Sequence, residues 1–308
     1  MKYPPQKTDA TDRHRWATRR LGNRLGYAIF HAMIRLGGRR LAYAALYFVV
    51  PYYVLLRPAV RQRSEPYLRH RFPGMGCLQR FISTWRLFLN MGKIMIDRAV
   101  AGIMGMETMQ SEVHGKEELI KLAREGSGFI LLMSHVGCWQ VAISALSFLN
   151  RPVNLLLEHE VEGSDRPYFD YDGSQAHIKV IDPRGYLGGT LEMLDVLKKG
   201  EVLCMMGDRA SGGEKSCVRV TFLRELAPFP FSAFQIASAS GVPVVVLLTH
   251  KTALDRYSLD VANIITVPKD LGRAGHEYIP YVIQFVEELE KYVQVHPFQF
   301  YNFYDMWG

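Results

Sequence analysis

Short, continuous apolar runs that end in glycine or polar residues recur along residues 109–308. The clearest of them, Phe129–Met133, is preceded by two glycines, which is the pattern of a strand buried on both faces of a parallel sheet. From Trp139 onward, apolar residues recur at helical spacing as far as Leu149. Residues 134–137 are therefore predicted to form the turn between a strand and a helix. Ligands of open α/β sheets bind at such turns, at the carboxyl ends of the strands.

The alternation of apolar runs and helical periodicity continues to the end of the chain. The order of elements is typical of an α/β fold with a mostly parallel central sheet flanked by helices. A short strand is predicted to begin at residue 113, and further strands are predicted at 152–157, 178–181, 201–206, 218–223, 241–248 and 257–265. The predicted helices are 117–124, 187–199, 232–240 and 278–293.

The N-terminal part is different, because its apolar residues form one long uncharged run, Leu41–Leu56. A spanning helix needs roughly 20 apolar residues, and this run is shorter and contains Pro51. Arginines at both ends and several tyrosines suit a membrane–water interface. We expect either a helical hairpin in one leaflet, with residues 37–38 as its turn, or a helix packed under the rest of the protein; a true span is the third alternative.

Residues 57–108 are predicted to be helical, with an apolar stripe between Phe81 and Met95 that is typical of core packing. The chain is thus expected to divide into a basic, apolar, membrane-associating helical region at 1–108 and an α/β domain at 109–308. Because the start is polar and no cleavage site follows an apolar run, no signal peptide is expected.

The formal net charge is +7, and it is concentrated at one end of the chain. Residues 1–71 carry fifteen Lys and Arg against three acids, a net charge of +12, which leaves the remainder at −5. A basic region suits an anionic membrane surface, an acidic protein or nucleic acid. The aromatic residues here lie in apolar runs rather than as stacking platforms, which argues against nucleic acid. The four cysteines lack CxxC spacing, so neither a zinc site nor a disulfide framework is expected.

His135 is the candidate catalytic group, because a neutral imidazole at the end of a buried strand can accept a proton near physiological pH. A lone histidine in a turn is more often a surface or capping residue, so its position alone does not decide. Ser134 precedes it without a G-x-S-x-G context, which does not favour a hydrolase-type nucleophile. Backbone N–H groups of residues 137–140 are the expected donors to an oxyanion.

The stretch Ser134-His135-Val136-Gly137-Cys138-Trp139 resembles the Ser-His-x-Gly-x-Trp signature of the late acyltransferases of lipid A synthesis, in the lysophospholipid acyltransferase superfamily. Gly207-Asp208-Arg209 and the closing His296-Pro297-x-Gln299 also resemble that family. So does Pro228-Phe229-Pro230-Phe231, for which the resemblance implies a turn. The resemblance implies acyl transfer from acyl carrier protein or acyl-CoA to a hydroxyl or amine of a lipid or glycolipid precursor. It implies His135 as general base, no cofactor beyond the co-substrate, and the cytoplasmic face of a bacterial inner membrane. The acidic carrier protein suits the basic arm better as the donor.

The chain departs from the family's His-x4-Asp/Glu pattern, because Gln140 stands in the place of the acid. An amide can orient the imidazole but does not stabilise its protonated form as a carboxylate does. We considered three explanations: another carboxylate, Glu158 or Asp208, substitutes; the acceptor is a reactive amine; or catalysis is lost and the protein is a lipid-binding module. The residues expected to contact substrate are Ser134, Gly137 and Trp139 of the motif, and Arg209 and Arg184, which follow strands and suit phosphate.

Overall fold

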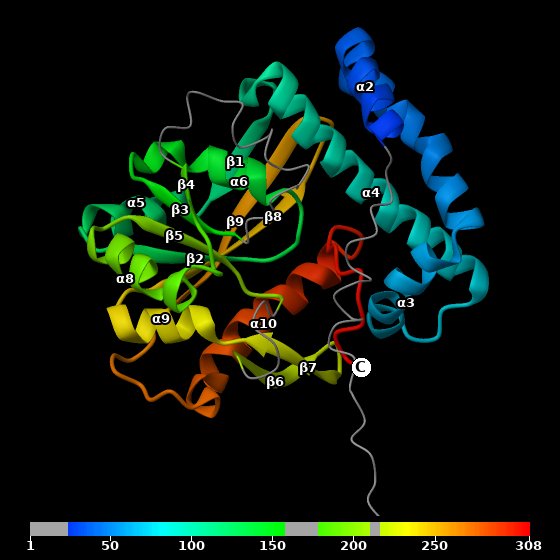
Figure 1. The fold of residues 1–308 in the computed structure, drawn as a ribbon. Helices are drawn as coiled ribbons and strands as arrows, with labels where there is room; N and C mark the ends of the chain where they lie inside the picture. The colour runs from blue at the N-terminus through cyan, green and yellow to red at the C-terminus, as the bar shows by residue number, and fades with distance from the viewer. Residues whose placement is uncertain (1–23, 158–177, 210–215) are drawn as a thin grey trace, which may run out of the picture.

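A computed structural model describes residues 24–157, 178–209 and 216–308, so Glu158 lies outside the described residues. Its centre is a seven-stranded sheet in which only the β8–β9 pair is antiparallel (Figure 1). The predicted α/β fold with a mostly parallel sheet is confirmed. In spatial order the strands are β1 (Gln110–His114), β9 (Arg256–Ile265), β8 (Val244–Lys251), β2 (Phe129–Met133), β5 (Val202–Met206), β3 (Val153–Leu156) and β4 (Ile178–Ile181).

Strand β2 occupies the middle of the sheet, where the sequence pattern predicts a strand buried on both faces. All five of its residues are buried, and it pairs in parallel with β5 on one side and β8 on the other. Figure 1 shows helices on both sides of the sheet. They are α5 (Lys116–Arg124), α6 (Trp139–Ala145), α8 (Thr190–Lys198), α9 (Ser232–Ser240) and α10 (Ile279–Val295).

A separate antiparallel hairpin joins β6 (Cys217–Phe222) to β7 (Glu225–Pro230). The expectation of a turn at residues 228–231 was wrong for 228–230, which belong to β7. The reversal occurs earlier, at Leu223 and Arg224, which both have positive φ. Prolines are tolerated in β7 because a two-stranded ribbon consists of edge strands, where a missing N–H need not break a ladder.

Between residues 24 and 104 the chain forms the helices α2 (Arg24–Leu56), α3 (Pro58–Arg71) and α4 (Cys77–Met104). The backbone of Gly38 is non-helical (φ 64°, ψ −164°), so α2 is kinked where the sequence predicts the turn of a hairpin. A 90° bend separates α2 from α3, and Arg61 donates to the last carbonyls of α2, at 2.6 Å to Val54 and 2.9 Å to Leu55. Among the described helices, no single one has the length and apolarity to cross a membrane; the bent pair α2–α3 meets those criteria only when taken together.

A buried carboxylate fastens these helices to the sheet. Asp97 on α4 is fully buried, and its oxygens lie 3.0 Å from Arg39 Nε on α2 and 2.6 Å from Lys251 Nζ on β8. The hydroxyl of Tyr43 donates to the same carboxylate at 2.7 Å, and that of Tyr257 on β9 also bonds to it. Since an unpaired buried charge is very costly, these partners make the junction between α2, α4 and the sheet specific.

Candidate active site

Two neighbouring strands of the sheet bring His135 and Asp208 together. Met133 and Met206 pair as the last residues of β2 and β5, and the Gly207 N–H donates to the Met133 carbonyl at 2.8 Å. The chain then turns out of the sheet on both strands. His135 Nδ1 lies 2.9 Å and 3.0 Å from the two Asp208 carboxylate oxygens, and the His135 backbone N–H donates to the same carboxylate at 3.2 Å.

The two side chains differ in their access to solvent. The Asp208 side chain is 1% exposed, whereas that of His135 is 30% exposed. Burial alone raises the pKa of the Asp208 carboxyl, but the charge and hydrogen bonds of His135, together with the Arg209 charge, hold it below its ordinary value of 3.8. An ionised carboxylate accepts hydrogen bonds but cannot donate them, so Nδ1 carries the proton of the neutral imidazole. The lone pair is then on Nε2, which is the arrangement of a general base.

The last residues of the chain hold the turn that carries His135. We call residues 296–308 the C-terminal segment. The Tyr301 N–H donates to the His135 carbonyl at 2.8 Å, Val136 and Phe300 form an antiparallel bridge, and the Gly137 N–H donates to the Gln299 carbonyl at 3.0 Å. Three consecutive residues of the turn are thus fixed by main-chain contacts.

Thr249, near the end of β8, contacts the same turn from the other side. Its hydroxyl accepts the Cys138 N–H and donates to the Val136 carbonyl, both at 3.1 Å. Gly137 has φ +50°, and a Cβ atom there would overlap the Thr249 carbonyl and hydroxyl, so this position requires glycine. The expectation that the N–H groups of residues 137–140 are oxyanion donors was wrong for Gly137 and Cys138, because Gln299 and Thr249 already use them.

Gln140 does not take the place of the missing acid. Its Oε1 lies 3.6 Å from the Cys138 sulfur. Within the described residues, the ring of His135 is bonded to Asp208 and not to Gln140. Asp208 thus supplies the carboxylate partner that position 140 lacks, from a different strand.

Comparison with known proteins identifies the family of the chain. The sequence model of the bacterial lipid A biosynthesis acyltransferase family matches residues 26–307, nearly the whole chain. The chain belongs to this family. A search among curated proteins finds no match. The family places the protein among acyltransferases of lipid A biosynthesis, which are membrane-associated in bacteria.

Of the two arginines predicted to bind substrate in this acyltransferase, Arg209 lies beside the His135–Asp208 pair, whereas Arg184 follows the edge strand β4, two strands away from β5. Arg209 Nη2 donates to the Tyr301 carbonyl at 2.6 Å, and its guanidinium lies 5.5 Å from the centre of the Tyr304 ring. Arg184 follows the edge strand β4, is half exposed, and lies 3.5 Å from the Asp182 carboxylate in its own turn. Strand β3 separates β4 from β5.

The remaining motif residues have mainly internal positions. Ser134 is 1% exposed, and its hydroxyl has no hydrogen-bond partner among the described residues. Trp139 is the first residue of α6, is partly buried and packs against the core.

The Tyr304 hydroxyl donates to the Asp208 carbonyl at 3.3 Å, and burial, with the nearby Asp208 charge, raises the pKa of Tyr304 to about 12.

Sequence reasoning identified Asp208 and Arg209 at the end of a strand but missed Thr249 and the role of the C-terminal segment. The available signal for Thr249 is that it is the first polar residue after the apolar run 242–248. Gln299 was noticed as part of the family's closing block, but nothing in a sequence shows that its carbonyl meets the Gly137 N–H.

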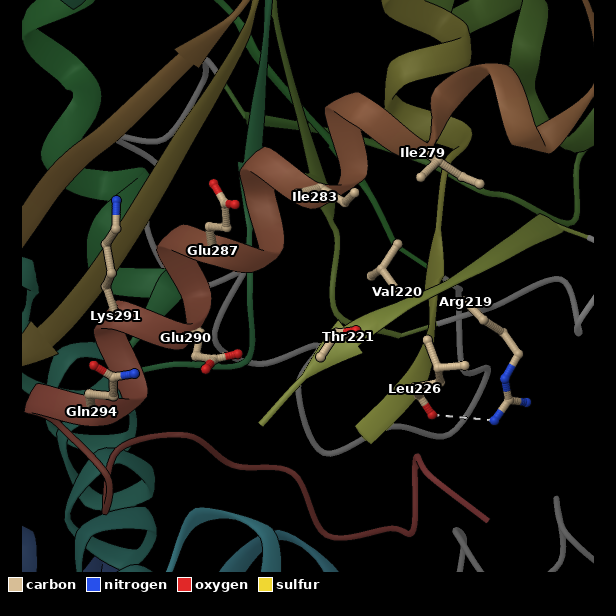
Figure 2. A pocket seen from close by; sticks show the side chains of 10 residues that line it. All are labelled: Arg219, Val220, Thr221, Leu226, Ile279, Ile283, Glu287, Glu290, Lys291 and Gln294. Atoms are coloured by element: carbon tan, nitrogen blue, oxygen red, sulfur yellow. Dashed lines mark hydrogen bonds between the residues drawn. The ribbon is translucent and has the colours of Figure 1, made fainter. Parts of the chain in front are cut away.

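Two other features of the acyltransferase were considered as sites. No cluster of three or more His, Cys, Asp or Glu suited to a metal ion occurs within the described ranges. A surface groove of about 520 Å³ lies between the β6–β7 hairpin and α10, as Figure 2 shows. Its apolar part includes Leu226 and Ile283, and Glu287 and Lys291 lie along α10 beside it. Neither His135 nor Asp208 lines it, so the groove is separate from the candidate active site.

Proposed function

We propose that the protein moves a fatty acyl chain from an acyl-thioester to a hydroxyl or amine of a lipid A-type precursor at the membrane, with His135 as general base. The observation that carries this proposal is the contact between His135 Nδ1 and the buried Asp208 carboxylate, at 2.9 Å. Family membership supports the reaction class, and this contact supports the assignment of the base.

The proposed reaction is a direct transfer. Nε2 of His135 takes the proton of the acceptor hydroxyl or amine as that group attacks the thioester carbonyl. The new ester or amide bond forms, the carbon–sulfur bond breaks, and the departing thiolate takes the proton back from His135. Asp208 keeps the imidazole in the required tautomer and stabilises its protonated form between the two steps.

A covalent acyl-cysteine intermediate is disfavoured by the chemistry of the nearest thiol. Cys138 lies in the same turn but is 1% exposed. Burial raises the pKa of its thiol to about 11, so the nucleophilic thiolate is scarce at physiological pH. This supports the direct attack of the acceptor.

In the proposed mechanism, the Asp208 carboxylate replaces the acid that is missing at position 140. This is the first of the three explanations given above for Gln140. The alternative function, a catalytically impaired lipid-binding module, gives the contact between His135 and the buried Asp208 carboxylate no chemical role. A partly exposed imidazole backed by an ionised carboxylate favours the enzyme. Arg209 beside this pair is proposed to attract a phosphate of the acceptor or of the donor's pantetheine arm.

The proposed location is the cytoplasmic face of the bacterial inner membrane, with residues 1–108 associating with the anionic surface and 109–308 carrying the chemistry. Large apolar side chains are exposed along α2, including Phe48 at 81% and Leu56 at 63%. The basic residues of 1–71 favour anionic lipid, and they favour the acidic acyl carrier protein over acyl-CoA as the donor.

The direct experiment is an acyl-transfer assay of the full chain in lipid vesicles, with acyl carrier protein or CoA carrying the acyl chain and a lipid A precursor as acceptor. We expect His135→Ala to lower the rate by about 10²–10⁴-fold, the usual contribution of a general base. His114→Ala, which changes an exposed histidine at the end of β1, is the matched control and should retain activity. Equal rates for wild type and His135→Ala would reject the proposal. An inactive wild type that gains activity from Gln140→Glu would favour the lipid-binding alternative.

A further inference from the structure

We propose that Thr249 is a positioning residue for the transfer reaction, because its hydroxyl fixes the two peptide groups on either side of Gly137. The proposal rests on the proposed function of His135. Thr249 acts through the turn and not on the substrate, since it is 2% exposed.

The hydroxyl directs its one donor and one of its two acceptor positions to the turn. It accepts the Cys138 N–H and donates to the Val136 carbonyl, each at 3.1 Å, so it spans the peptide groups before and after Gly137. Val136, Gly137 and Cys138 are all buried. Without the hydroxyl, the Cys138 N–H and the Val136 carbonyl would lie inside the protein without these partners, a state that folded proteins avoid by changing the backbone conformation.

Thr249 is itself held firmly, which makes it a fixed reference for the turn. It pairs with Leu259 across the β8–β9 ladder, and its carbonyl accepts the Tyr292 hydroxyl of α10 at 2.8 Å. Its branched Cβ restricts rotation about χ1. The hydroxyl therefore has a single direction, toward the turn.

The position of the imidazole depends on this turn. His135 immediately precedes Val136, whose carbonyl Thr249 holds, and the left-handed conformation of Gly137 sets the direction of the chain that follows. The contact with Asp208 holds Nδ1 of the imidazole ring, whereas the backbone of the turn sets the position of the Cα atom that carries the side chain. A small rotation of the Val136 peptide would move Nε2 away from the position from which it takes the acceptor's proton.

The test uses Thr249→Val, which keeps the shape of the side chain and removes the hydroxyl, and Thr249→Ser, which keeps the hydroxyl and removes the methyl group. We expect Thr249→Val to lower kcat by about 10²-fold, as for a misplacement of about 1 Å, with KM changed by less than about twofold. Thr249→Ser should retain kcat within about tenfold of wild type. A Thr249→Val enzyme with the kcat of wild type, or equal losses in both variants, would overturn the proposal.

A double-mutant cycle separates positioning from a general loss of folded enzyme. If Thr249 acts through His135, then adding Thr249→Val to His135→Ala should leave the residual rate unchanged, because residues that act as a unit are not additive. A further loss of similar size in the double variant would show a structural effect and refute the inference. Should His135→Ala keep full activity, the proposed function itself fails, whereas a failure of the Thr249 variants alone leaves it intact.

Discussion

The Asp208 carboxyl is almost completely buried, and yet its pKa lies below the ordinary value. Burial favours the neutral acid, so the charge and the three contacts of His135 must outweigh it, with help from Arg209. The pair is therefore an ionised carboxylate against a ring nitrogen that carries its proton. This leaves the second ring nitrogen free to accept a proton from an acceptor.

The lowered pKa makes Asp208 a source of pH-dependent stability. Because the pKa is lower in the folded state than the unfolded value of about 3.9, the ionised group favours folding at all pH values above about 3.9. That contribution is lost as the pH falls below 3.9 toward the folded-state pKa. We expect Asp208→Asn to be less stable than wild type in urea denaturation at pH 6, with the difference shrinking between pH 5 and pH 3.

Asp195→Asn is the matched control, since that carboxylate is 54% exposed and pairs with Lys199 on the surface of α8. Its effect on stability should be small at each pH. A difference between wild type and Asp208→Asn that stays constant from pH 6 to pH 3 would contradict the assignment of an ionised, stabilising carboxylate.

At the residue scale, polar residues that directly follow buried strands can be identified as site candidates from the sequence. His135 and Asp208 were both found this way, because the carboxyl ends of parallel strands meet at one edge. Whether Asp208 or Gln140 would face the imidazole was not predictable, because that depends on which strands are neighbours. Thr249 was missed for the same reason: its hydroxyl matters only because β8 lies next to β2.

At the scale of elements, α2 exposes large apolar side chains on its outer face. Phe48, Tyr52 and Leu55 are all more than half exposed, whereas the opposite face packs against α4 through Leu46 and Tyr43. Such a contiguous apolar surface in a basic region is typical of association with a membrane.

We expect replacement of Phe48 or Leu55 by serine to weaken binding to anionic vesicles by about ten- to hundredfold each, as for the loss of one buried large apolar side chain. Leu226→Ser on β7 is the matched control, because Leu226 is 55% exposed and Leu55 58%. Cosedimentation with vesicles measures the effect. If Leu226→Ser weakens binding as much as Leu55→Ser, α2 is not the membrane-contacting element.

Elements with one strong periodicity were the easiest to predict. The five buried residues of β2 and the apolar repeat of α10 each have one consistent pattern. Of the β6–β7 hairpin, the strand at 218–223 was predicted and β7 was not, because Pro228 and Pro230 suggest a turn. The turn residues are Leu223 and Arg224, which are not the glycine or asparagine that positive φ usually requires. The packing of α10, where Glu290 accepts the Leu223 N–H at 3.0 Å, supports this turn from outside the hairpin.

At the scale of the whole molecule, the helical region and the sheet share one hydrophobic core that runs from Ile34 to Met306. Asp97 and its hydrogen-bonding partners lie at their junction. One of these partners, Lys251, is bonded through its backbone to the side chain of Gln299 in the C-terminal segment. The same segment holds the turn of His135. The proposed membrane-contacting helices and the proposed catalytic turn thus belong to one connected structure.

In the proposed mechanism Asp208, and not the residue at position 140, makes His135 a base. The most direct measurement is kcat for acyl transfer by the full chain in vesicles, compared between Asp208→Asn and Gln140→Leu. Loss of the orienting acid should lower kcat by about 10⁴-fold in Asp208→Asn, mainly through the wrong tautomer. Gln140→Leu should stay within about tenfold of wild type. A nearly normal kcat for Asp208→Asn together with an inactive Gln140→Leu would contradict the account.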